Sequence, residues 1–220
     1  MRQDAIEAIR RAATEHGINP AWALAVAQRE SDFDPNARAS KTIYGVFQMT
    51  NGLRNKWGSG DSADPYTQAQ SFMRYIRGEV RPEMRSVLGR DPTNAELYAG
   101  HHFGPVRAAR MIGGGYDQNT PVDEIFTPYE RSLNPHFDRA GTSGNLLASI
   151  NNDMAKRTMR FGGDGSLGGG TDFAESSPKG LDFSQFGTPV DAGGAVDFSQ
   201  FGTPVETTSA ESPQPSQQAA

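Results

Sequence analysis

Cysteine is absent from the chain, which excludes disulfides, cysteine-ligated zinc, iron–sulfur clusters and thiol catalysis together. Long hydrophobic runs are missing as well. The longest, residues 21–27, falls far short of the ~18 apolar residues that indicate a membrane span. The first residues, 1–7, carry acids where a signal peptide would have its apolar region. We therefore expect no membrane span and no signal peptide, so that a substrate outside the cytoplasm would be reached by another route.

Positive charge is almost absent from the last part of the chain. Residues 161–220 carry 1 Lys or Arg against 8 Asp and Glu, whereas residues 1–160 carry 20 against 18. A near-neutral body with an acidic tail argues against nucleic-acid binding, which depends on neutralising phosphates. Because the tail is rich in Gly, Ser, Pro and Gln, it cannot bury enough apolar area to offset its chain entropy, and we expect it to be disordered.

The tail contains a repeat. LDFSQFGTPV at residues 181–190 and VDFSQFGTPV at residues 196–205 are identical at nine of ten positions. Two copies of so short a unit do not make a solenoid. The repeat is either a duplicated linker or a docking motif whose phenylalanines bind a partner, such as a protein of a virion or of a secretion complex.

The body reads as mainly α-helical. Residues 4–16 have apolar positions at helical spacing, and Asn19 with Pro20 is a favourable start for a second helix over residues 21–30. Residues 31–63 lack a sustained period and indicate a long irregular loop or a short hairpin. Further helices are expected from Asp64-Pro65, from Asp91-Pro92-Thr93 to about His102, from Gly104-Pro105 to Ile112, and around Leu146–Met154 with Ser143 as its cap.

Glu30 is the best candidate for a catalytic acid. The second helix is apolar on all sides until its last turn, so it should be buried and should deliver Glu30 to the edge of a cleft. A carboxyl held partly out of water has a raised pKa, which suits general acid catalysis. The alternative from position alone is an ordinary solvated glutamate at a helix end.

Three motifs follow one another in the chain. They are ESDFDPNARAS at residues 30–40, GVFQMT at residues 45–50 and ELYAGHHFGPVRAARMI at residues 96–112. In this order they resemble the soluble lytic transglycosylase family, which has a goose-lysozyme-like fold, and the resemblance covers roughly residues 5–137. One extra residue before Ser40 is a departure from the family pattern. The resemblance implies a mainly α, lysozyme-like domain that acts on peptidoglycan.

The resemblance also implies a mechanism with one carboxyl. The family glutamate protonates the oxygen between N-acetylmuramic acid and N-acetylglucosamine, the N-acetyl oxygen attacks the anomeric carbon, and a 1,6-anhydro product forms. An ordinary two-carboxylate muramidase is the alternative, because other acids follow Glu30 in the chain. These candidate second acids are Asp32, Asp34, Asp61 and Asp64.

Matched residue by residue, Glu30 takes the family's acid and base role and Ser31 supports the helix end. Ser40 corresponds to the serine near the N-acetyl group, with Ala39 as a rival. Gln48 matches a glycan-binding glutamine. Its neighbours in the same loop are further candidates for substrate contact, namely Tyr44, Phe47 and Thr50.

The third motif departs most from the family. Its tyrosine position is His101, and Tyr98, one helical turn earlier, is a second candidate for a group beside Glu30. A Leu-Tyr-x-x-His-x-x-Gly string resembles phage-borne members of the family. Tyr129 and residues 134–137 are rival matches for the family's last tyrosine. Neighbouring histidines on a helix point apart, so we expect neither a metal nor a cofactor.

The sequence thus predicts a catalytic domain over residues 1–140, an amphipathic helix or linker over 141–160 and the acidic tail over 161–220. The expected function is local opening of the cell wall by a phage virion, delivered to the host periplasm, or by a secretion apparatus. The alternatives are a muramidase and a weakly active, glycan-binding structural virion protein.

Overall fold

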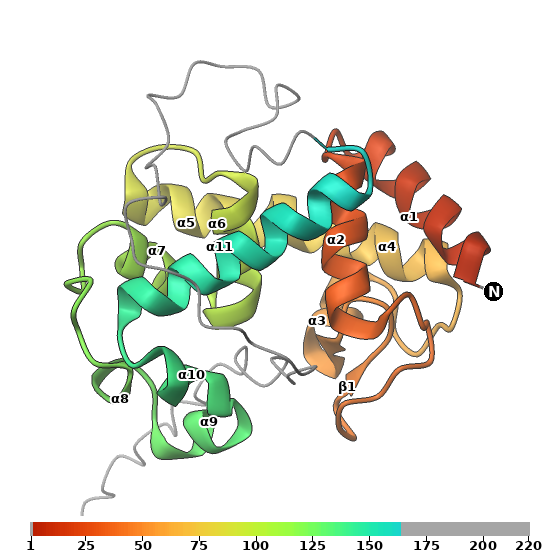
Figure 1. Cartoon of the computed structure of the whole chain (residues 1–220). Coiled ribbons are helices and arrows are strands. Elements are labelled where there is room, and N and C mark those ends of the chain that lie inside the picture. The colour runs from red at the N-terminus through yellow and green to blue at the C-terminus, as the bar shows by residue number, and fades with distance from the viewer. Residues whose placement is uncertain (1, 164–220) are drawn as a thin grey trace, which may run out of the picture.

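The computed structural model describes residues 2–163, and these fold into a mainly α-helical body (Figure 1), as the sequence predicts. The duplicated segment and nearly all of the expected tail lie outside the described residues. No helix among residues 2–163 is long and apolar enough to cross a membrane.

The first two helices match the expected ranges closely. Helix α1 spans Arg2–Glu15 and α2 spans Pro20–Ser31. The Asn19 side chain accepts hydrogen bonds from the backbone N–H groups of Ala21 (2.9 Å) and Trp22 (3.3 Å), so it caps α2 as its sequence predicts. Residues 21–27 of α2 are all buried, which makes this helix a rigid core element.

Residues 31–63 contain the short hairpin that was one of the two expectations, together with a helix that was not expected. Strands β1 (Ile43–Tyr44) and β2 (Met49–Thr50) pair antiparallel, and helix α3 spans Asn51–Trp57. Helix α3 could not be predicted from the sequence, because Arg54 is its only buried residue and the helix shows no apolar period. Local capping defines it instead: Thr50 accepts from Leu53 N–H at its start, and Gly58 has a φ of 92° at its end.

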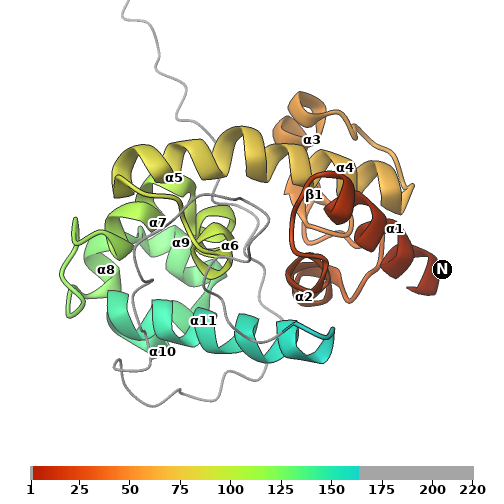
Figure 2. The same ribbon diagram turned by 90° about the horizontal axis from the view of Figure 1, so that it is seen from above.

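A long rod connects the two halves of the molecule (Figure 2). Helix α4 (Pro65–Tyr75) begins at the cap Asp64 and continues through a π-helical turn, η1 (Ile76–Val80), into α5 (Arg81–Leu88). Pro82 has no N–H to donate to the preceding turn, which accounts for a widened turn just before it.

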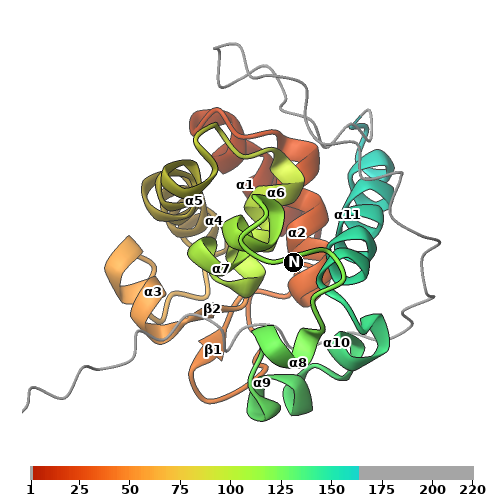
Figure 3. The same cartoon turned by 90° about the vertical axis from the view of Figure 1, so that its left-hand side faces the viewer.

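The second half is built around α6 (Asn94–Phe103), which lies in the middle of Figure 3. Thr93 and Glu96 form a capping box at its start. Gly100 allows close packing, because a Cβ there would lie 2.4 Å from the sulfur of Met84. The remaining helices of this half are α7 (Pro105–Ile112), α8 (Val122–Ile125), α9 (Pro128–Leu133) and α10 (Pro135–Ala140).

Helix α11 (Ser143–Arg160) crosses the front of the molecule in Figure 1 and packs against α2 and α6. Its cap is Thr142, which accepts from Asn145 N–H (3.3 Å), rather than the expected Ser143, which is buried in the first turn. Beyond the helix, the ring of Phe161 meets the ring of Phe33 edge-on at 5.8 Å. Phe161, the first residue after α11, thus contacts the turn that follows α2.

Candidate active site

The carboxyl of Glu30 contacts a buried phenol. Glu30 lies in the last turn of α2 and is partly exposed. The hydroxyl of Tyr98, on α6, donates a hydrogen bond to Oε1 of Glu30 at 2.9 Å. Tyr98 is itself fully buried. The end of the apolar helix thus holds a carboxyl with a fixed neighbour at the boundary between core and surface.

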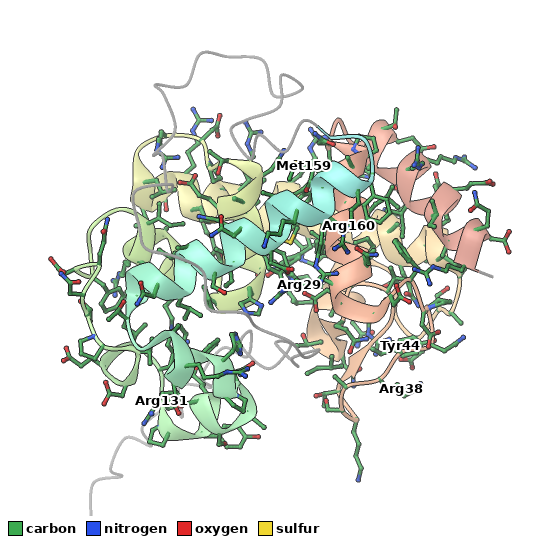
Figure 4. All side chains as sticks on the ribbon, in the orientation of Figure 1. Arg29, Arg38, Tyr44, Arg131, Met159 and Arg160 are labelled. Atoms are coloured by element: carbon green, nitrogen blue, oxygen red, sulfur yellow. The ribbon has the colours of Figure 1, made fainter. Side chains whose placement is uncertain are left out.

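Arg29 determines the direction of that hydrogen bond. Its Nε donates to the Tyr98 hydroxyl at 2.7 Å, and its Nη1 contacts Asp153 on α11. Because the hydroxyl accepts the Arg29 proton, its own single proton is directed at Glu30. Arg29 lies near the middle of the molecule beneath α11 (Figure 4). Sequence analysis missed Arg29 and Asp153, although an arginine on an apolar helix is a signal, since a buried charge needs a partner.

The electrostatics of this group are coupled. Burial disfavours the charge of Arg29, but the attraction of Tyr98, Asp153 and Glu30 outweighs it and raises the pKa of the guanidinium. Burial raises the pKa of Tyr98 well above its ordinary value, against the effect of the Arg29 charge. Tyr98 therefore remains a protonated donor, and Arg29 remains a cation, over the whole physiological range.

The chain leaves α2 through a strained turn. Asp32 and Phe33 both have a left-handed backbone, with φ values of 51° and 70°. Their N–H groups cap the helix by donating to the carbonyls of Gln28 (3.1 Å) and Ala27 (3.4 Å). A bulky residue such as Phe33 rarely adopts this conformation, and its buried ring holds it there. The strain lies directly beside Glu30.

The loop of residues 45–48 is fixed to both α2 and α4. Ser31 Oγ donates to the carbonyl of Val46 at 2.9 Å, and Oε1 of Gln68, on α4, accepts from Val46 N–H at 2.7 Å. Gly45 has a φ of 92°, and a Cβ there would lie 2.5 Å from Oε1 of Gln68. Gln68 is buried and was missed by sequence analysis, because a single glutamine within an amphipathic helix carries no motif.

The side chain of Gln48 makes its hydrogen bonds within this part of the chain. Its φ is 46°, its amide donates to the carbonyls of Ala37 (3.1 Å) and Gly45 (2.7 Å), and its Oε1 accepts from Ala39 N–H (3.1 Å). Gln48 is only 5% exposed. The structure thus places it as a brace between the two halves of the loop that follows Glu30.

The other predicted residues of this loop differ in exposure. Phe47 is buried and stacks on Phe72 with ring centroids 4.0 Å apart, and Thr50 caps α3. Ser40 is partly exposed, with its Oγ 3.2 Å from that of Thr42.

The ring of Tyr44 contacts two guanidinium groups. Arg38, labelled beside Tyr44 in Figure 4, lies 4.3 Å from its ring centroid. Arg54 lies 4.7 Å from the same centroid, and the Tyr44 hydroxyl donates to Asn36 at 3.2 Å. The ring lines a cavity of about 10 Å³ together with Arg54 and Ser59.

His101 lies among aromatic rings. Its ring centroid is 5.1 Å from that of Phe72 and 6.0 Å from that of Tyr75, both in edge-on contact. Burial lowers the pKa of His101 to about 4, against the effect of a hydrogen bond to the backbone of Phe47. Of the two candidates on α6, Tyr98 therefore makes the hydrogen bond to Glu30, and His101 is a neutral packing group near Phe47 at neutral pH.

The four acids weighed as second carboxyls all have local partners. Asp32 pairs with Arg2, and Asp61 with Arg54. Asp34 accepts from Asn36 N–H, and Asp64 caps α4 through Thr67 N–H. Within residues 2–163, no group of three His, Cys, Asp or Glu side chains is placed to hold a metal ion.

The rivals for the family's last tyrosine lie on α9 and α10. Tyr129 is 65% exposed, whereas Asn134 is buried and its amide donates to the carbonyl of Glu130 at 2.9 Å. The exposed Tyr129 and the buried Asn134 therefore both remain candidates for that place.

Comparison with known proteins adds one family. Residues 7–69 match the model of the transglycosylase SLT domain, which is lysozyme-like and implies a peptidoglycan substrate. The search of curated proteins finds no match. The matched range contains Glu30, Gln48 and Gln68, whereas Tyr98, His101 and Asp153 lie beyond it. The N-terminal part of the body thus carries the family signature, and the rest of the site comes from helices outside it.

Proposed function

We propose that the protein is a peptidoglycan lytic transglycosylase in which Glu30 acts first as acid and then as base. The observation that carries this proposal is the hydrogen bond from Tyr98 to Glu30. It holds the carboxyl of the family motif at the end of a rigid, buried helix. Positioning of this kind keeps a general acid within reach of its substrate atom.

In the proposed reaction, Glu30 gives its proton to the oxygen between N-acetylmuramic acid and N-acetylglucosamine. The bond from that oxygen to the anomeric carbon breaks while the N-acetyl oxygen of the muramic acid attacks the same carbon. Glu30, now a carboxylate, takes the proton of the C6 hydroxyl, whose oxygen displaces the N-acetyl oxygen. The product is a 1,6-anhydro sugar, no water is consumed, and Glu30 is again protonated.

Local pairing of the neighbouring acids supports one carboxyl rather than two. A muramidase needs a second carboxyl at a set separation across the sugar. Asp34 and Asp64 accept backbone hydrogen bonds in their turns, and Asp32 and Asp61 face arginines. Each acid thus has a local partner, which favours the single-carboxyl mechanism over the two-carboxyl one.

We assign two kinds of role to the remaining residues. Ser40 and Thr50 retain exposure, and we propose that they contact the glycan. Ser31 and Gln48 act through their hydrogen bonds by holding the loop against α2, and the buried rings of Tyr44 and Phe47 give that loop its core. His101 is proposed to pack behind the loop through Phe47.

We also propose delivery by a phage virion or a secretion apparatus, for local opening of the wall. The Leu97-Tyr98-x-x-His101 string supports this, because it resembles phage-borne members of the family. Detection of the chain in purified virions or secretion complexes by mass spectrometry would test it. Finding it only among free periplasmic proteins would contradict it.

The decisive experiment digests purified peptidoglycan and identifies the products by mass spectrometry. Anhydro-muropeptides are expected from the wild-type chain, and Glu30→Gln should lower their formation by about 10² to 10⁴-fold. Glu124→Gln, on the exposed face of α8, is the matched control and should keep full activity. Reducing-end products would indicate a muramidase, and binding without release would indicate a glycan-binding protein.

A further inference from the structure

A set of charged side chains lies behind Glu30, and the role inferred for them rests on the proposed function. A chain of contacts runs from Glu30 through the Tyr98 hydroxyl to Arg29, and from Arg29 to Asp153 on α11. Asp153 also accepts a hydrogen bond from Nε of Arg157 at 3.0 Å. These residues come from α2, α6 and α11, so the chain of contacts exists only when all three helices are packed.

The Arg29–Asp153 pair differs from an ordinary surface ion pair. The Arg29 side chain is 16% exposed and that of Asp153 is 32% exposed. Interactions between partly buried charges are screened much less than those at the surface. The electrostatic interaction of Arg29 with Glu30 is therefore only weakly screened by solvent and salt.

Arg29 has two carboxyl partners, Glu30 and Asp153, whose charges both stabilise it. When Glu30 takes up its catalytic proton, Arg29 loses one of these charges and Asp153 remains as the other. Without Asp153, protonation of Glu30 would leave the largely buried Arg29 guanidinium without a carboxylate charge to balance it. A buried charge that lacks such a partner is destabilising. Asp153 thus makes the protonated form of Glu30 easier to reach.

We propose that Arg29 and Asp153 are a positioning pair for the reaction, with Arg29 directing the Tyr98 proton to Glu30 and Asp153 balancing the Arg29 charge while Glu30 is protonated. Neither touches the substrate. The C-terminal helix α11 therefore takes part in catalysis through Asp153, although it lies outside residues 7–69.

The other titratable groups near this pair are histidines. His102 stacks on Tyr98 at 5.4 Å, and His136 lies 6.3 Å from His102 between ring centroids. Burial, followed by the charge of Arg29, lowers the pKa values of both, that of His136 to about 3. Burial also lowers the pKa of His101. All three histidines therefore take up protons only in acid. The basic limb of the pH–rate profile, where Glu30 loses its proton, is free of their effect and is the appropriate measurement.

The test measures kcat/KM on purified peptidoglycan against pH. Arg29→Gln removes a positive charge and should move the basic limb to higher pH, and Asp153→Asn removes a negative charge and should move it to lower pH, each by about one pH unit. A residue that only stabilises the fold would lower activity at all pH values without moving the limb. Arg107→Gln, which breaks the ion pair with Glu130 elsewhere, is the matched control and should leave the limb in place.

The double variant Arg29→Gln, Asp153→Asn keeps the proposal testable if Arg29→Gln fails to fold. It removes both charges together, so the limb should return toward its wild-type position while kcat stays lower, because the Tyr98 proton is no longer directed. Shifts in the same direction, or no shift, in an active protein that requires Glu30 would overturn the positioning pair alone. An inactive wild-type protein, or full activity in Glu30→Gln, would instead overturn the proposed function, and the pair would fall with it.

Discussion

Tyr98 donates its proton to Glu30 at 2.9 Å although 68 residues separate the two in the chain. The same hydroxyl accepts from Arg29 at 2.7 Å, so its only proton is directed at the carboxyl. A buried hydroxyl in this position fixes the rotamer of the carboxyl. The packing of α6 against the end of α2 is therefore inseparable from the geometry of Glu30.

Tyr98→Phe should damage both activity and stability. The substitution keeps the buried ring but removes both hydrogen bonds, so we expect at least a tenfold loss of kcat and a loss of about 1–3 kcal/mol in the free energy of unfolding. Tyr75→Phe, at another buried tyrosine beside His101, is the control. Steady-state kinetics and urea unfolding measure the two effects. Equal kcat values in the two variants would contradict a role of the Tyr98 hydroxyl in the reaction.

Shortening the chain should separate the body from the tail. A chain ending at Gly163 keeps α11 and the contact of Phe161 with Phe33, and we expect wild-type activity on peptidoglycan and an unchanged thermal midpoint. A chain ending at residue 140 loses α11 with Asp153 and the buried residues Leu146 and Ile150, and it should fail to fold. Calorimetry and wall-cleavage assays compare the two. An active chain of 140 residues would show that α11 is dispensable.

Acid should destabilise the protein through its buried histidines. The pKa of His101 is about 4 in the folded state and near 6.5 when unfolded, so the unfolded state binds more protons between these values. The contribution of the neutral, buried His101 to the free energy of unfolding is therefore fully present above pH 6.5. It is lost as the pH falls toward 4. His101→Tyr should show a smaller loss over this window in urea unfolding. An activity inflection near pH 6.5 that disappears in His101→Tyr would contradict the packing role.

The Gly45 position should reject a side chain. Gly45→Ala places a Cβ in a left-handed conformation and 2.5 Å from Oε1 of Gln68, which holds Val46 N–H. The conformation alone costs ~1–2 kcal/mol, and the clash adds to it. Gly89→Ala is the control, since its φ is also positive, at 69°, but nothing lies within 4 Å. We expect the thermal midpoint to fall further in Gly45→Ala, and cell-wall cleavage to fall only there. Equal effects would mean that the Gln68 contact is unimportant.

Features that depend on neighbouring residues could be predicted from the sequence. Asn19 and Pro20 begin α2, Thr93 precedes α6, and the continuous apolar surface of residues 21–27 predicts a buried helix that ends at Glu30. These follow from hydrogen bonds and periodicities within one turn of helix. Helix α3 was not predicted although its caps are local, because Arg54 is its only buried residue and the helix therefore has no apolar period.

Only the tertiary structure decided which side chains stand behind Glu30. Tyr98 and His101 are one turn apart and equally plausible in sequence, and the packing of α6 turns the phenol to Glu30 and the imidazole toward Phe72. Asp153 meets Arg29 across 124 residues. No local pattern encodes such a pair, because its contact depends on how α11 packs on α2, and that packing is determined by the whole apolar core.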